Sequence, residues 1–122
     1  MKPPLERHLQ QAVLAHLKKL RRTDPTLVFR KRHGSALGTA GDPDIYGLWH
    51  STHFEIELKA PGLSPTPLQQ ARLQDWAKAG ALTAVVHSIP ELELFLTTLA
   101  PSQNTSLLDP AAGTPRQRVT PL

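Results

Sequence analysis

The sequence of 122 residues contains no cysteine. This absence excludes disulfides and thiolate metal sites such as zinc fingers, so any bound metal is expected to have oxygen ligands. Long apolar runs are also missing. Segment 1–7 lacks the apolar stretch of a signal peptide, and no segment approaches the ~18 apolar residues of a membrane span. We therefore expect a soluble, cytoplasmic protein, and the length suits one domain with a single core.

Acidic residues are fewer than basic ones, which gives a formal net charge of +4 and a pI near 9.9. Most of the basic charge lies in the first third, at the end of a predicted helix (18–22) and in the run 30–33. Basic side chains contact phosphates and suit a polyanionic partner, although cations at 18–22 also favour a helix C-terminus. The side chains expected to bind DNA are Arg30, Lys31, Arg32, His33 and, in the following loop, Ser35.

Hydrophobic periodicity predicts one α/β domain with the element order α-β-β-β-α-β-α. The short connection 49–52 indicates an antiparallel hairpin, and the long crossover through the second helix allows parallel pairing of the last strand. A mixed sheet flanked by helices follows. The expected helices are 5–20, 67–78 and 89–99, and the expected strands are 27–31, 44–48, 53–60 and 82–87.

Local signals support these boundaries. The sequences Thr66-Pro67-Leu68-Gln69 and Ser88-Ile89-Pro90-Glu91 both have the form of a capping box with proline at or near the first helical position. After residue 100 the composition changes to Pro, Ser, Thr, Gln, Ala and Gly. We therefore expect a folded domain over 1–100 and a flexible tail over 101–122.

The third predicted strand carries an unusual charged row. Its apolar side chains, Phe54, Ile56 and Leu58, alternate with Glu55, Glu57 and Lys59. Such a row is either the solvated face of a half-exposed strand or part of a metal site. Magnesium takes oxygen ligands and commonly uses only one or two protein carboxylates. The hairpin register brings Asp44 opposite the end of this strand, so Asp44 and Glu57 are candidate ligands and Lys59 completes a hydrolytic set.

These residues resemble a known signature. Pro43-Asp44 followed, thirteen positions after the aspartate, by Glu57-Leu58-Lys59 is similar to the PD-(D/E)xK nuclease superfamily motif. Glycines 41 and 47, the loop 59–64 and a helix that extends from Gln69 to Gly80 make the whole pattern over about 6–99 resemble the VRR-NUC family, the virus-type replication-repair nuclease module, in a stand-alone form. The resemblance implies a restriction-endonuclease-like αβββαβ core with an extra C-terminal helix.

The resemblance also implies a reaction, the Mg²⁺-dependent hydrolysis of DNA phosphodiesters, with Mn²⁺ able to substitute. Asp44, Glu57 and the backbone carbonyl of Leu58 would hold the metal, and Lys59 would orient the attacking water. In these nucleases a glutamate of the first helix joins the acidic cluster, which points to Glu6. A glutamine that precedes the helix-ending glycine joins the site, which points to Gln69. Without the family, Glu6 would serve the helix dipole and Gln69 its capping box.

The resemblance leaves the DNA substrate less determined. Stand-alone members resemble Holliday-junction resolvases, which implies branched DNA and a homodimer, with Leu48 and Trp49 as candidate interface residues. A flap nuclease, a restriction-type endonuclease and a non-catalytic DNA-binding or assembly subunit with the same fold are the alternatives.

Four nearby polar residues are expected outside the site. Asp42 lies in an extended loop before the proline, and Glu55 is farther from Lys59 than Glu57 is, so we expect Glu55 to be solvated or to face a dimer partner. His50 and His53 flank the hairpin turn without a third ligand, and we expect them to be surface residues.

Overall fold

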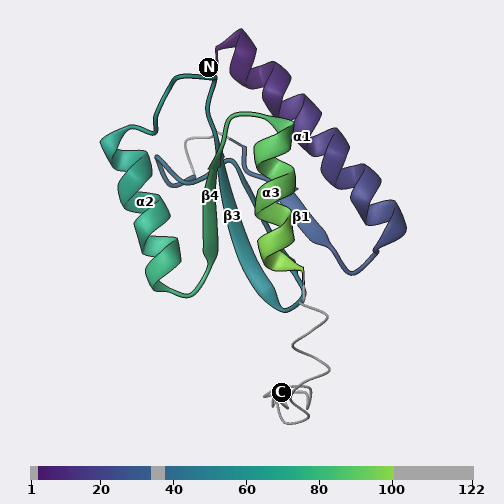
Figure 1. The fold of residues 1–122 in the computed structure, drawn as a ribbon. Helices are drawn as coiled ribbons and strands as arrows, with labels where there is room; N and C mark the ends of the chain where they lie inside the picture. Colours follow the sequence, from purple (N-terminus) through teal and green to yellow (C-terminus); the bar gives the residue numbers. More distant parts are fainter. Residues whose placement is uncertain (1–2, 34–37, 101–122) are drawn as a thin grey trace.

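The computed structural model describes residues 3–33 and 38–100 (Figure 1). The elements are α1 (Pro4–Thr23), β1 (Val28–Lys31), β2 (Ile45–Trp49), β3 (Thr52–Leu58), α2 (Pro67–Lys78), β4 (Leu82–Val86) and α3 (Ile89–Leu99). This order confirms the predicted one. The expected tail, 101–122, lies outside the described residues. Within the described residues, no helix has the length and apolar character needed to cross a membrane.

Helix α1 continues past its predicted end at residue 20. The apolar stripe stops at residue 20, but Arg21 and Arg22 are exposed and have good helix propensity. The helix therefore ends only at Thr23. The backbone N–H of Asp24 donates to the carbonyl of Leu20 (2.9 Å) and closes the last turn. Pro25 then excludes further helix, because the residue before a proline avoids the helical region.

The four strands form one mixed sheet in the order β1-β2-β3-β4. The first two pairings are antiparallel and β3 pairs with β4 in parallel, as predicted. Strands β2 and β3 are joined by His50 and Ser51, whose φ angles of 51° and 64° are both positive. Positive φ at both central residues is the type I′ geometry that matches the twist of a hairpin. This tight turn fixes the register of β2 against β3.

The hydrophobic core lies between one face of the sheet and the helices α1 and α3, whereas α2 covers part of the other face (Figure 1). The rings of Phe54 and Phe95 meet edge to face across this core, with centroids 6.4 Å apart. Burying such side chains stabilises the fold by roughly 1.5–3 kcal/mol each. The buried residues of this core are Val13, Leu17, Leu27, Ile45, Trp49, Phe54, Ile56, Leu58, Val86, Leu92, Leu96 and Leu99.

The charged row of β3 is buried on the opposite face, toward α2. Glu55 is 0% exposed and Glu57 is 1% exposed. The alternative of a half-exposed strand with a solvated charged face is therefore wrong. A buried carboxylate needs compensating partners, so these two positions require a specific environment.

The predicted capping boxes differ in their outcome. At α2, Thr66 accepts from the N–H of Gln69 and Gln69 accepts from the N–H of Thr66, so the box is complete. At α3, Ser88 accepts from the N–H of Glu91 (3.3 Å), but the Glu91 carboxylate bonds His87 instead, through its backbone N–H and its ring. The second box is therefore only half formed, because His87 offers Glu91 two nearby donors.

Candidate active site

Asp44 lies where β2 begins and meets the end of β3. Its Oδ2 accepts a hydrogen bond from the backbone N–H of Leu58 (2.8 Å). The ladder pairs Ile45 with Ile56, so the next pair along places Asp44 opposite Glu57. Residues directly opposite in an antiparallel pair share a face of the sheet. The predicted register, which brings Asp44 to Glu57, is confirmed.

Glu57 and Lys59 belong to the same end of the sheet. The backbone N–H of Lys59 donates to the carbonyl of Val86 (3.1 Å), which continues the parallel pairing of β3 with β4 by one residue. Alternation along the extended chain then puts Lys59 on the same side as Glu57. Glu57 is buried and Lys59 is half-buried. Two carboxylates and one ammonium group therefore share one face at one sheet end.

This donor set has the chemistry of a site for a hard cation. Two carboxylates with a main-chain carbonyl are oxygen ligands of the kind that magnesium uses, with waters completing the shell. Within 3–33 and 38–100, no three or more His, Asp or Glu side chains are grouped to hold a metal ion. The fit therefore depends on the two carboxylates at the sheet end, and the expected contribution of Glu6 to the acidic cluster stays a prediction.

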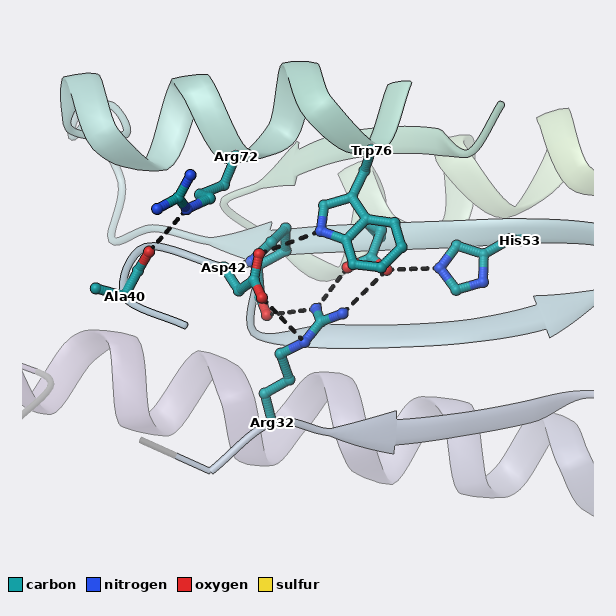
Figure 2. A network of polar contacts seen from close by, with 8 residues as sticks. Arg32, Ala40, Asp42, His53, Arg72 and Trp76 are labelled. Carbon is teal, nitrogen blue, oxygen red and sulfur yellow. Dashed lines mark hydrogen bonds and ion pairs between the residues drawn. The ribbon is translucent and has the colours of Figure 1, made fainter. Parts of the chain in front are cut away.

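Glu55, two residues before Glu57, is bonded to Arg32 and His53 (Figure 2). Nη1 of Arg32 donates to Oε1 of Glu55 (2.5 Å) and Nη2 donates to Oε2 (3.2 Å). Nε2 of His53 lies 2.5 Å from Oε2, and since a carboxylate only accepts, this nitrogen carries the hydrogen. The expectation of a solvated or dimer-facing Glu55 is therefore wrong. The buried carboxylate is neutralised inside the protein.

The Arg32 guanidinium is enclosed by several groups. It lies 4.5 Å from the ring centroid of Tyr46 and 5.2 Å from that of Trp76, and Nη1 also donates to the carbonyl of Pro43 (2.9 Å). Burial acts to lower the pKa of this guanidinium, but the hydrogen bonds and charge of Glu55 outweigh it and hold the pKa above its ordinary value. Arg32 is thus permanently charged and held by internal partners.

The other residues expected to bind DNA differ from Arg32. Arg30, Lys31 and His33 are exposed. Within the described part of the chain, the side chain of Arg30 donates only to a neighbour in its own strand, the carbonyl of Phe29 (2.7 Å). The basic run therefore divides into exposed side chains and one enclosed side chain. Ser35 lies outside the described residues.

The loop 38–43 before Asp44 is hydrogen-bonded to α2, a contact that the sequence did not indicate. Nε of Arg72 donates to the carbonyl of Ala40 (3.0 Å), and Nε1 of Trp76 donates to Oδ1 of Asp42 (3.2 Å) (Figure 2). Gly41 has a φ of +83°, and a Cβ there would lie 2.7 Å from Cγ of Leu68. Only glycine suits both this backbone conformation and this close approach. The glycine that precedes the Pro-Asp pair thus has a packing reason.

A cleft of about 950 Å³ opens beside this loop. The exposed end of β1 forms one side and the loop 38–44 forms the other, and Asp44 and Tyr46 belong to its lining. Lys31 and His33 also line it, so the cleft combines basic side chains with one of the expected metal ligands. Glu57 and Lys59 are not part of this lining.

Comparison with known proteins gives structural matches. No known protein family and no curated protein matches the sequence. A solved structure named "VRR_NUC domain" has a TM-score of 0.64 and 21% identity, covering 80% of this chain and 100% of that chain. Another, named "VRR_NUC domain protein", has a TM-score of 0.60 and 19% identity, covering 81% and 90%. The chain has the VRR_NUC fold. The mixed sheet and its helices are accordingly consistent with a restriction-endonuclease-like core.

Two further residues were expected at the site of this VRR_NUC fold. Glu6 is 4% exposed and belongs to the first turn of α1. The start of α1 lies at the end of the sheet where β4 leads into α3 (Figure 1). The Glu6 side chain is therefore buried, and its role in the acidic cluster stays a prediction. Gln69 uses its side-chain oxygen to accept from the N–H of Thr66 (2.9 Å). The capping role of Gln69 is therefore present, and a role in the site remains a prediction.

The two turn histidines do not form a pair. His50 is exposed and its ring lies against Trp49, with centroids 4.3 Å apart. His53 is only partly exposed: it bonds Glu55 and stacks on Trp76 at 5.2 Å. The expectation of a surface residue holds for His50, whereas the His53 side chain is 36% exposed and also bonded to the buried Glu55. Glu55 lies two residues along the same strand face and draws the His53 ring inward.

Proposed function

We propose that this chain is a nuclease of the PD-(D/E)xK type that hydrolyses DNA phosphodiester bonds with the help of a divalent metal ion. One observation carries the proposal. The Asp44 carboxylate is bonded to the Leu58 amide, directly across from Glu57 and on the face of Lys59, within a VRR_NUC fold. It supports the interpretation of these two acids and the lysine as the hydrolytic set of the sequence motif.

The ion would be Mg²⁺, for which Mn²⁺ can substitute. Its ligands would be Asp44, Glu57 and the carbonyl of Leu58. When bound, such an ion polarises the phosphate and lowers the pKa of a coordinated water. Lys59 would place its ammonium group beside the reacting phosphate, where it orients the attacking water and stabilises the anionic transition state. Glu6 and Gln69 would complete the polar surroundings of the site.

Exposed basic residues beside the cleft support DNA as the polyanion. Lys31 and His33 line the cleft together with Asp44, and Arg30 is exposed next to Lys31. These side chains would contact the backbone of a DNA whose phosphate meets Asp44. Phosphate contacts of this kind make affinity fall as salt rises. Binding to DNA in the absence of metal should therefore weaken with salt and with the removal of these side chains.

Cleavage assays with substitutions test the chemistry. We expect Asp44→Asn, Glu57→Gln and Lys59→Met each to lower the cleavage rate by on the order of 100-fold or more, while DNA binding in EDTA is retained. Glu93→Gln, which removes an exposed acid on α3, is the matched control and should cleave like the wild type. A Glu57→Gln protein with wild-type activity would show that the metal-ligand assignment is wrong.

For the substrate, we propose a branched DNA such as a four-way junction, cut by a homodimer. The support is the likeness to compact VRR_NUC chains, since two symmetric cuts suit a two-fold dimer.

Incubation with Mg²⁺ and linear, flap and four-way-junction DNAs separates the alternatives. Paired nicks in junctions favour resolution, flap cleavage favours the flap nuclease, cutting at one linear sequence favours a restriction-type enzyme, and no cleavage favours a DNA-binding subunit. Light scattering tests the dimer.

A further inference from the structure

We infer that Arg32 and Glu55 are positioning residues, a buried pair that fixes the Pro43-Asp44 segment so that the Asp44 carboxylate stands where a metal ligand is needed. The inference rests on the proposed function, because it takes Asp44 as a ligand. It assigns a role to two residues that the hydrolytic motif itself does not include.

Arg32 holds the main chain on both sides of the Asp44 side chain. Its Nη1 donates to the carbonyl of Pro43 (2.9 Å), and its backbone N–H donates to the carbonyl of Asp44 (2.8 Å). These carbonyls belong to the two peptide groups that flank the Cα of Asp44. Because each peptide group is planar, fixing both of them restricts the direction in which the Asp44 side chain leaves the backbone.

Glu55 in turn holds the guanidinium. The carboxylate binds Arg32 through both of its oxygens, and the geometry of a guanidinium fork against a carboxylate allows little rotation. The rings of Tyr46 and Trp76 lie against the guanidinium, with centroids 4.5 Å and 5.2 Å from its Cζ, and limit its movement further. His53 bonds the second oxygen of Glu55 and so orients the carboxylate itself.

A second connection reaches the same segment from α2. Asp42, on the other side of Pro43, accepts from Nε1 of Trp76 (3.2 Å) and lies 3.9 Å from Nε of Arg32 (Figure 2). Residues 42–44 are therefore held by the side chain of Arg32, which directly follows β1, and by one side chain from α2. Groups that orient a metal ligand through hydrogen bonds typically change metal affinity ~10–100-fold when they are mutated.

Substitution of Arg32 separates this role from a direct phosphate contact, which has to be tested because Arg32 also lines the cleft beside the loop 38–44. The Arg32 side chain is 22% exposed and Glu55 is fully buried. A lysine at position 32 would keep the positive charge that a phosphate needs, but it lacks the planar fork that binds Glu55 and Pro43 together. Arg32→Lys therefore separates a positioning role from a charge effect. Arg30→Lys, on the exposed side chain two residues earlier in the chain, is the matched control for Mn²⁺ binding.

The test measures the binding of Mn²⁺ alone, without DNA, by titration calorimetry. Wild type, Arg32→Lys, Glu55→Gln and Arg30→Lys are compared after circular dichroism has shown which of them are folded. We expect Arg32→Lys and Glu55→Gln each to bind Mn²⁺ ~10-fold or more weakly than the wild type. The double variant Arg32→Lys/Glu55→Gln should lose less Mn²⁺ affinity than the product of the two single effects, because both residues act through one pair. Arg30→Lys should match the wild type in Mn²⁺ affinity. In cleavage assays the Mn²⁺ concentration for half-maximal rate should rise more than the maximal rate falls.

Each other outcome overturns the inference. Wild-type Mn²⁺ affinity in either folded variant removes the positioning role, and so does a loss of DNA affinity in EDTA with Mn²⁺ binding unchanged. If Arg32→Lys does not fold, the Mn²⁺ affinity of Glu55→Gln tests the inference. Failure of the proposed function is seen separately: the wild type then binds no Mn²⁺, or Asp44→Asn binds it as well as the wild type does.

Discussion

Removing the Arg32 guanidinium should destabilise the fold far more than its place in a basic run suggests. In Arg32→Met the side chain keeps most of its length, but the fully buried Glu55 loses the cation that binds both of its oxygens. Breaking a buried ion pair by removing one partner costs about 3–5 kcal/mol, because the remaining charge is left uncompensated. The Pro43 carbonyl also loses its donor.

This cost is large on the scale of the whole domain. The free energy of unfolding of domains of this size is about 5–15 kcal/mol, and each kcal/mol lost lowers the melting temperature by about 4–8 °C. We therefore expect a melting temperature lower by on the order of 15–30 °C. Urea unfolding at neutral pH, followed by far-UV circular dichroism, gives the free energy directly. Circular dichroism avoids the fluorescence of Trp76, whose ring lies over the substituted side chain.

Two companion variants make the reasoning refutable. Arg30→Met removes an exposed guanidinium and should change the unfolding free energy by less than about 0.5 kcal/mol. Arg32→Met/Glu55→Leu removes both charges and should recover most of the loss, since apolar replacement of a buried pair is often neutral. A loss below about 1 kcal/mol in Arg32→Met, which is the value of a surface pair, would refute the argument. A double variant as unstable as the single one would do the same.

Two further predictions concern packing and pH. Gly47→Ala would place a Cβ 2.2 Å from the Val28 carbonyl oxygen and 2.5 Å from Cζ of Phe54, so we expect a loss of at least ~1–3 kcal/mol in urea unfolding, and a loss below ~0.5 kcal/mol would contradict this. Hydrogen bonds to the Leu63 carbonyl and to Glu91 raise the pKa of His87. Its stabilisation is therefore complete below the unfolded pKa and lost as pH rises through the folded pKa. The melting temperatures of wild type and His87→Gln should converge between about pH 6 and 8, and a constant difference would exclude this role.

Much of the fold could be predicted because local patterns determine it. The stripe of α1 and the alternation in β3 depend on residues close in sequence, and the two-residue turn at 50–51 fixes which β2 residue faces which β3 residue. For this reason the juxtaposition of Asp44 with Glu57 followed from the sequence. Helix ends were less certain, since residues 21–23 carry no apolar signal yet continue α1.

The partner of Glu55 could not be predicted in the same way. A long connection joins β1 to β2, so no tight turn fixes their register, and the consecutive residues Arg30, Lys31 and Arg32 offered no basis for choosing one of them. The charge of Glu55 on an alternating strand indicated solvent, because alternation is the pattern of a half-exposed strand. Only the position of α2, which brings Trp76 over Arg32, makes this part of the face an interior.

The direction taken by Arg32 links these two parts of the charged face. The pairing of Lys31 with Ile45 places Arg32 beside Asp44 and in line with Glu57, yet its side chain turns along the strand to Glu55, across Tyr46. Turned the other way, the same guanidinium would meet the Asp44 and Glu57 carboxylates and occupy the position proposed for a metal ion. Glu55 therefore does more than neutralise Arg32. By fixing its direction, Glu55 would leave Asp44 and Glu57 to the divalent ion that we propose for the site.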